Sequence, residues 1–325
     1  MVKIIKDGAD PDLLIKIAEL YYERNCTQQQ IAHELRMSRS NVQRLLQIAR
    51  DEGIVQIRII RSSRPRRDLE AALVERLGLV RAIVIPEPVN TQNMVNRNLV
   101  SYSAKYISDM IQTGDIISIG WGTTIHGVVA NLGQTSRQIT CVPLSGGLGQ
   151  LKQEYQINEM SRLFAEAFGC IWVPLHAPSL IMDEKLKKSI LSEPSIDKAV
   201  NLWGQLDVLI AGIGTMENFI NRSPIFSVLT NGNLAQSINE HLRDLGAVGN
   251  VCDRYFDING KICPTELDKM MLAITPEQLR MVNKSIGVAG GANKVKPIIA
   301  AARSRCINIL ITDEATAELA VATLS

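Results

Sequence analysis

The sequence predicts an α/β protein: a small helical head followed by a doubly wound, mostly parallel sheet. Two observations carry this prediction. Residues 11–53 carry helical patterns joined by tight connections, whereas seven short runs rich in Ile and Val follow residue 68, with helical stretches between most of them. Strands that are apolar throughout and separated by helices form parallel sheets that are covered on both faces.

Length and composition set the class of protein. At 325 residues the chain is long enough for a well-buried core and for more than one domain. No apolar run approaches the roughly 18 residues that cross a bilayer, and the N-terminal stretch MVKIIKDGADPD lacks the apolar stretch of a signal peptide. We therefore expect a cytoplasmic protein with no membrane partner.

The six cysteines and four histidines are scattered along the chain, and no C-x-x-C pair occurs. This pattern favours reduced, mostly buried thiols and indicates no metal site. We expect no cofactor.

Charge is divided unevenly along the chain. Residues 1–67 hold 13 Lys and Arg against 8 Asp and Glu, a net charge of +5, whereas the remainder holds 22 against 25, a net charge of −3. A basic head on a near-neutral body is typical of a protein whose head contacts DNA.

The first two helices of the head are predicted from apolar spacing and capping residues. In DLLIKIAELYYERN the apolar positions recur at helical spacing, and they are Leu13, Leu14, Ile17, Ala18 and Tyr21. Thr27 is a good N-cap for the second helix, and Gln30 would complete a capping box. This short helix is expected to bury Ile31, Ala32 and Leu35, and the small Ala32 lets the next helix cross closely.

A tight corner, RMS (36–38), leads to the third helix. Ser38 caps it, Gly53 ends it, and its expected buried positions are Val42, Leu45, Leu46 and Ala49. A cap, a small residue, a three-residue corner and a second cap make up the helix-turn-helix pattern of DNA-binding proteins. Glycine is usual at the corner, and Arg36 in its place is expected to cost about 1 kcal/mol.

The exposed face of the third helix carries residue types that bind base edges and phosphates in a major groove. Arg39 and Asn41 are candidates for base contacts, whereas Ser38, Ser40 and Arg44 are candidates for phosphate contacts. The full set of expected DNA-contacting residues is Thr27, Gln28, Ser38, Arg39, Ser40, Asn41, Gln43 and Arg44. An amphipathic helix pair with a solvated polar face is the alternative.

The segment after the head sets the predicted domain boundaries. IVQIRII (54–60) alternates like a strand and would form a small wing or a bridge, and RSSRPRR (61–67) is basic and polar with a proline, as expected of a linker. We therefore expect a DNA-binding domain over residues 1–60, a linker over 61–67 and a second domain over 68–325.

The predicted strands of the second domain end in loops of small residues. The strands are AIVIP (82–86), IISIG (116–120), ITCVP (139–143), CIWVP (170–174), DVLIAGIG (207–214), SIGVAGG (285–291) and INILIT (307–312). The loops are GWGTT (120–124), LSGGLG (144–149), AGIGT (211–215) and AGGANK (289–294). In an open parallel sheet, ligands bind beyond the carboxyl ends of the strands, where such loops collect.

These loops favour a small phosphorylated ligand. Glycine lets backbone N–H groups approach an anion, and the N-terminus of a following helix adds a favourable dipole. Thr123 and Thr124 add hydroxyl donors, and Lys294 is placed to reach a phosphate. A dinucleotide fits less well, because GWGTTI and GIGTME both lack the third glycine of the nicotinamide fingerprint.

No catalytic residue is predicted. Asp253, Asp257 and Asp313 lie near predicted loops or helix starts, and His126 and His176 lie near strand ends. Nothing in their spacing pairs a nucleophile with a base. We expect structural roles for all five.

Six stretches carry a resemblance to a known family. They are LYYERNCTQQQIAHELRMSRSNVQRLLQIARDEGIVQIRI, ISIGWGTTI, VPLSGGLG, DVLIAGIGT, GAVGNVCDRYFDINGK and VAGGANKVKPIIAAARSRCINILITDEATA. Through them nearly the whole chain resembles the SorC family of bacterial sugar-responsive transcriptional regulators. The resemblance implies a sugar-binding domain similar to sugar-phosphate isomerases, a phosphorylated sugar or polyol as effector, and a homotetramer on operator DNA.

The resemblance also implies an effector site at the strand ends. Its expected residues are Trp121, Gly122, Thr123, Thr124, Ser145, Gly146, Gly147, Asn250, Gly290, Gly291 and Lys294. Lys294 and the two glycines before it would hold the phosphate. Asn250 stands where family members commonly carry an aspartate, and this exchange bears on which hydroxyl groups are preferred. Trp121 would either stack on a sugar face or simply pack.

The sequence thus predicts a DNA-binding transcriptional regulator of a carbohydrate operon that is controlled by a phosphorylated sugar or polyol and is not an enzyme. Two alternatives stay open. One is a sugar-phosphate isomerase-like enzyme with a DNA-binding appendage, and the other is a nicotinamide-sensing repressor.

Overall fold

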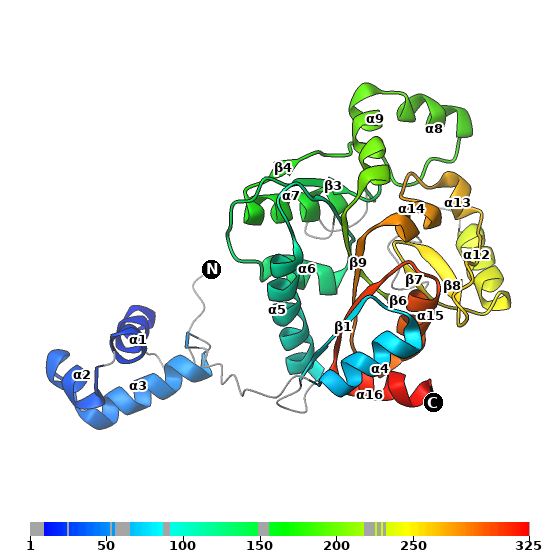
Figure 1. The fold of residues 1–325 in the computed structure, drawn as a ribbon. Coiled ribbons are helices and arrows are strands. Elements are labelled where there is room, and N and C mark those ends of the chain that lie inside the picture. The colour runs from blue at the N-terminus through cyan, green and yellow to red at the C-terminus, as the bar shows by residue number, and fades with distance from the viewer. Residues whose placement is uncertain are drawn as a thin grey trace. The chain divides into compact units, whose positions relative to one another are not determined.

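Figure 1 shows the computed structural model, which describes residues 10–24, 26–52, 54–55, 66–86, 92–148, 156–217, 225, 229 and 232–324. The chain divides into two compact units, a head (Met1–Ser62) and a body (Ser63–Ser325). Gly53 and most of the predicted strand 54–60 and linker 61–67 lie outside the described residues, so these three assignments stay predictions.

The head contains three helical segments that share one core. They are α1 (Pro11–Ala18), which continues as a π-helical stretch η1 (Glu19–Glu23), α2 (Gln28–Glu34) and α3 (Arg39–Asp51). Their buried side chains are Leu14, Ile17, Ala18, Leu20, Ile31, Ala32, Val42, Leu45, Leu46, Ile48 and Ala49. The apolar pattern of the sequence predicted most of this core, whereas Leu13, Tyr21 and Leu35 are only partly buried.

The predicted caps and corner of the head are confirmed. The Gln30 amide donates to Thr27 Oγ1 (3.3 Å) and the Thr27 amide donates to Gln30 Oε1 (2.8 Å), which completes the capping box. Ser38 Oγ accepts from the Asn41 amide at 3.2 Å and caps α3. Arg36 has a φ of 52°, so a residue with a Cβ does occupy the left-handed conformation at the corner.

The body is organised around a sheet of seven strands in which all neighbours are parallel. The order is β1-β10-β9-β5-β2-β3-β4. The strands are β1 (Arg81–Ile85), β2 (Ile116–Ile119), β3 (Thr140–Pro143), β4 (Ile171–Trp172), β5 (Val208–Gly212), β9 (Lys284–Val288) and β10 (Ile309–Asp313). All seven predicted strands are therefore present.

The order of the strands reverses at the centre of the sheet. From β2 the chain moves outward through β3 and β4, and from β5 it moves outward in the other direction through β9 and β10. Loops that leave two neighbouring strands in opposite directions open a crevice beyond their carboxyl ends. This topology therefore predicts a binding site between the ends of β2 and β5.

Helices cover both faces of this sheet (Figure 1). One face packs against α4 (Arg67–Leu77), α9 (Pro194–Asn201), η3 (Leu202–Gln205), α14 (Pro276–Met281), α15 (Val295–Arg303) and α16 (Glu314–Thr323). The other packs against α5 (Gln92–Met110), α6 (Thr123–Ala130) and α7 (Ile157–Phe168). Successive strand residues enter opposite cores: in β5, Leu209 joins the first and Ile210 joins the second.

A second, antiparallel sheet was not predicted from the sequence. It contains β6 (Gly214–Thr215), β7 (Ala247–Val251) and β8 (Arg254–Asp257), in the order β6-β7-β8. Tyr255 of β8 packs in a third core with side chains of α12 (Gly232–Asp244) and α13 (Leu267–Met270). Because β6 starts two residues after β5 ends, this sheet stands at the carboxyl end of β5.

Among the described residues the body also contains α8 (Glu184–Leu191) and η4 (Ala292–Lys294). Within the part of the chain that the structure describes, no helix is long and apolar enough to cross a membrane.

The core of the head makes a testable stability prediction. Ile31 of α2 is fully buried, whereas Ile15 of α1 is 43% exposed. We expect Ile31→Ala to lower the free energy of unfolding of the head by about 2–5 kcal/mol, because it leaves a cavity, and Ile15→Ala to change it by less than about 1 kcal/mol. Hydrogen exchange of the α2 and α3 amides measures both, and equal protection in the two variants would contradict the packing.

Candidate functional sites

The start of α3 presents a polar surface. Ser38, Arg39, Ser40 and Arg44 are exposed and Asn41 is half-buried. Ser38 Oγ lies 3.0 Å from Ser40 Oγ, and Arg44 Nη2 donates to Asn41 Oδ1 at 3.4 Å.

Gln43, like Arg39, is an exposed side chain of this surface. Neither makes a hydrogen bond with the described residues. Their guanidinium and amide groups are therefore available to an incoming acceptor, and five of the six predicted residues at this helix start are exposed.

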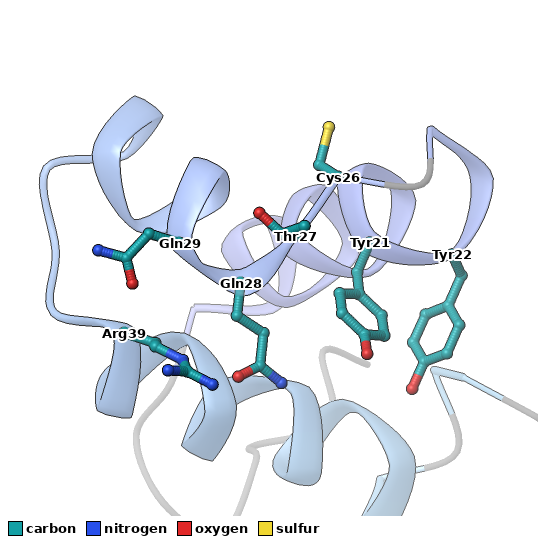
Figure 2. A pocket seen from close by; sticks show the side chains of 7 residues that line it. All are labelled: Tyr21, Tyr22, Cys26, Thr27, Gln28, Gln29 and Arg39. Atoms are coloured by element: carbon teal, nitrogen blue, oxygen red, sulfur yellow. The ribbon is translucent and has the colours of Figure 1, made fainter.

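Thr27 and Gln28, predicted with this set, lie in a pocket of about 600 Å³ at the junction of the three helices. Figure 2 shows Gln28 between the Arg39 side chain and the rings of Tyr21 and Tyr22. The pocket is lined by Tyr21, Tyr22, Cys26, Thr27, Gln28, Gln29 and Arg39. Helical spacing predicted Tyr21 at the core, whereas nothing in the sequence pattern singled out Tyr22. Both side chains pack against the core of the head and also line this pocket.

The loop after β2 reaches the central crevice of the body. A Cβ on Gly120 would lie 3.2 Å from Ala211 Cα, so glycine allows the ends of β2 and β5 to approach closely. Gly122 has a φ of 118° and is the N-cap of α6, with no hydrogen bond from a capping side chain. The first amides of α6, at Thr123 and Thr124, have no acceptor within the helix. The predicted residues 121–124 therefore stand at the crevice.

The loop after β3 is held by backbone hydrogen bonds. The Gly146 amide donates to the Leu272 carbonyl oxygen (2.9 Å), and the Gly147 amide donates to the Ala177 carbonyl oxygen (2.8 Å). Ser145 is buried and forms an isolated bridge with Ala273. This loop lies at the expected edge, but its amides already have partners.

The loop after β9 is tied to the start of α16. The Gly291 amide donates to Asp313 Oδ2 (3.1 Å) and to Thr316 Oγ1 (2.6 Å). The neighbouring Gly290 leaves room for this carboxylate, since a Cβ there would collide with Asp313. Lys294 Nζ donates to the carbonyl oxygen of Ile213 at 2.6 Å and so brings its charge to the loop after β5.

Asn250 lies in β7, opposite Gly214 of β6. It is buried, and a Cβ on Gly214 would collide with its side-chain amide. The small antiparallel sheet therefore holds Asn250 close to the end of β5. The structure thus brings the predicted effector residues to one edge of the sheet.

The turn between β7 and β8 is strained. Val251 pairs with Arg254, which leaves a two-residue turn of Cys252 (φ 53°) and Asp253 (φ 56°). Positive φ at both positions is the type I′ conformation, which usually contains Asn-Gly. Positive φ costs a residue with a Cβ about 1–2 kcal/mol, although aspartate tolerates it better than most.

The carboxyl of Asp253 is buried, and its hydrogen bonds do not fully offset the loss of water. Asp253 is 5% exposed, and its Oδ1 has no hydrogen-bond partner among the described residues. Burial raises the pKa of this carboxyl to about 7, although the positive charge of Arg254 and an interaction with the Trp121 side chain lower it. The structural role predicted for Asp253 from the sequence does not account for this burial.

The other two aspartates that the sequence singled out satisfy the backbone. Asp257 Oδ1 accepts from the amides of Asn259 and Lys261, and Asp313 caps α16 by accepting from the Thr316 amide. These contacts support the structural roles expected for them. Among the described residues, no group of His, Cys, Asp and Glu side chains could hold a metal ion.

Known proteins resemble both the head and the body. Residues 64–322 match the family model described as "Putative sugar-binding domain". The chain is 31% identical over 321 residues to the deoxyribonucleoside regulator of Bacillus subtilis, which covers 97% of this chain and 99% of that protein. It is 32% identical over 326 residues to the sorbitol operon regulator of Klebsiella pneumoniae, with coverages of 97% and 99%. The crystal structure of the full-length sorbitol operon regulator SorC from Klebsiella pneumoniae matches with a TM-score of 0.70 and 31% identity, covering 95% of this chain and 98% of that one.

The surroundings of Asp253 predict how stability depends on pH. Its pKa is about 7 in the folded chain and 3.8 in a model peptide, so between these values the folded state keeps a proton that the unfolded chain loses. The free energy of unfolding therefore falls as the pH rises from about 4 to 7, and the loss is complete above pH 7. We expect Asp253→Asn to raise the free energy of unfolding at pH 8 by on the order of 2–4 kcal/mol, and by less at pH 5.

Urea denaturation followed by tryptophan fluorescence measures this difference, because all three tryptophans (121, 172 and 203) lie in the body. Asp109→Asn, at an exposed aspartate of α5, controls for the loss of one charge. An equal gain at both pH values for Asp253→Asn would show that the carboxyl does not titrate in this window.

Proposed function

Because this chain belongs to the SorC family of sugar-binding transcriptional regulators, we propose that its head binds the operator of a carbohydrate operon and that a phosphorylated sugar or polyol controls this binding from the body. The relatives named above regulate a deoxyribonucleoside system and a sorbitol operon. The observation that carries the DNA half of the proposal is the exposed polar surface at the start of α3, which Ser38 caps and which belongs to a basic head.

The geometry of this face supports a recognition helix. Arg39 and Asn41 lie in the first turn of α3, which is the part of a recognition helix that contacts base edges, while Ser38, Ser40 and Arg44 suit phosphate contacts. Thr27 and Gln28, with the tyrosine hydroxyls of the adjoining pocket, suit the DNA backbone beside the groove. A net charge of +5 over residues 1–67 favours the approach to DNA.

The crevice between β2 and β5 is the proposed effector site. The N-terminus of α6, with Thr123 and Thr124, and the ammonium of Lys294 offer the donors and the positive charge that a phosphate requires. The amides of Gly146, Gly147 and Gly291 donate to protein acceptors, so we propose that these glycines and Ser145 shape the site. Asn250, Trp121, Gly122 and Gly290 complete it near the sugar.

The effector would regulate DNA binding by shifting the populations of different arrangements of the heads. An effector that binds one arrangement of the heads better than another changes how often the heads match the operator spacing. We propose a homotetramer in the cytoplasm, where the operator is, and no catalytic activity.

A thermal-shift screen tests the effector class. The purified protein is heated with sorbitol 6-phosphate, 2-deoxyribose 5-phosphate and fructose 6-phosphate, with their phosphate-free parents and with NADH. A ligand that binds only the folded state raises the melting temperature. Stabilisation by a phosphorylated compound and not by its parent is expected. Stabilisation by NADH alone would favour the nicotinamide-sensing alternative, and turnover of a sugar phosphate would favour the isomerase-like alternative.

Arg39→Ala tests the DNA-reading face. If Arg39 contacts a base, its loss weakens operator binding by about 1–3 kcal/mol and leaves non-specific binding nearly unchanged. Fluorescence anisotropy with an operator duplex selected from random DNA, and with a scrambled duplex, measures both. Arg50→Ala, which removes the same charge from the exposed far end of α3, is the matched control. An equal loss on both duplexes would reassign Arg39 to the phosphate backbone.

Lys294→Ala tests the phosphate site. The variant loses one positive charge at the crevice, so we expect binding of the phosphorylated effector to weaken by about 10-fold to 100-fold while operator affinity without effector is retained. Lys296→Ala, at an exposed lysine of α15, is the matched control. Isothermal titration gives the affinities, and an unchanged response in Lys294→Ala would remove this residue from the site.

A further inference from the structure

Asp253 lies outside the predicted effector set, and its side chain does not stabilise the hairpin that contains it. It occupies a left-handed position in the turn between β7 and β8, where glycine is preferred. Its carboxyl is 5% exposed, and Oδ1 has no partner among the described residues. Residues held in sparsely populated backbone conformations cluster at ligand-binding positions.

The neighbouring arginine does not neutralise this carboxyl by pairing with it. The Arg254 guanidinium points into another network, in which Nη1 donates to Asp268 Oδ1 at 2.5 Å and Nη2 donates to the Ile274 carbonyl oxygen at 2.8 Å. Cys252, the other turn residue, contributes only a buried thiol. Oδ1 of Asp253 therefore has no partner within this hairpin, while the carboxyl interacts with the Trp121 side chain.

One contact of Asp253 and one of Asn250 place this hairpin beside the ends of β2 and β5. The Trp121 side chain, from the loop after β2, interacts with the Asp253 carboxyl. On the same hairpin Asn250 lies against Gly214, just beyond the end of β5. The turn thus stands beside the loops of the two strands between which the order of the sheet reverses.

We propose that Asp253 accepts a hydrogen bond from a hydroxyl group of the bound carbohydrate, beside the indole of Trp121, and thereby selects among effectors by the position of that hydroxyl. This proposal rests on the proposed function, because it assumes a carbohydrate in the crevice. A buried carboxylate oxygen without a partner gains most from a ligand that donates to it, and a site built to bond a hydroxyl rejects analogues that lack it.

Binding measured at pH 8, where the carboxyl is ionised, tests the proposal. Sorbitol 6-phosphate, 2-deoxyribose 5-phosphate and fructose 6-phosphate are titrated calorimetrically into the wild-type chain, Asp253→Asn and Asp253→Gly. Both variants suit a positive φ, so both are expected to fold, which cooperative melting verifies. The compound that binds the wild type is expected to bind both variants about 10-fold to 100-fold more weakly.

Arg305→Gly is the matched control for backbone relief. Arg305 is exposed and also has a positive φ, 61°, but it lies in the connection between α15 and β10. Glycine there removes strain without touching the turn, so effector affinity is expected to equal that of the wild type.

A hydroxyl-specific measurement separates recognition from structural support. Single-deoxy analogues of the bound compound are titrated in turn, and removal of one particular hydroxyl is expected to weaken binding to the wild type but not to Asp253→Asn. Equal affinities of the wild type and Asp253→Asn for the parent compound, or equal losses for every analogue, would overturn the role of Asp253 while the proposed function stands. If no panel compound binds the wild type, the proposed effector class fails and this inference fails with it.

Discussion

The reversal of strand order between β2 and β5 is the constraint on which the rest of the body depends. Because all seven strands are parallel, every loop that follows a strand lies at the same edge. Between β2 and β5 these loops diverge, and the absence of a Cβ on Gly120 lets the two strand ends meet closely. The antiparallel sheet begins with β6 just after β5, and the pairing of β7 with β6 brings Asn250 and the turn that contains Asp253 to the same edge.

Much of this could be predicted from the sequence because the signals are local. A capping box is formed by residues three apart, Thr27 and Gln30, and a short apolar run predicts each strand. The partners of the glycine-rich loops are remote in sequence: Gly146 is bonded to Leu272, and Gly291 to Thr316. A glycine after a strand predicts that its backbone amide can approach an acceptor closely. It does not show whether that acceptor is a ligand anion or another part of the chain.

The antiparallel sheet escaped prediction for a related reason. β6 contains only Gly214 and Thr215, and its partner β7 lies beyond α12 in the sequence, so neither length nor alternation identifies the pair. Tyr21 and Tyr22 show the same limit in the head. Helical spacing places Tyr21 on the apolar face, yet a phenol can be half-buried and keep its hydroxyl at the surface, which only the packing of the helices decides.

The aspartates of the body differ in whether their carboxylates stabilise the fold. Asp183 and Asp313 accept backbone amides at helix starts, and Asp257 does so in a turn, so each carboxylate stabilises the element that positions it. Asp253 does none of this: it stands at a left-handed position, its burial opposes ionisation, and the nearest guanidinium is committed elsewhere. Glycine or asparagine would serve the turn better. Asp253 lowers the stability of its own hairpin at the edge where the strand order reverses. The proposed carbohydrate effector, and not the stability of the fold, accounts for this residue.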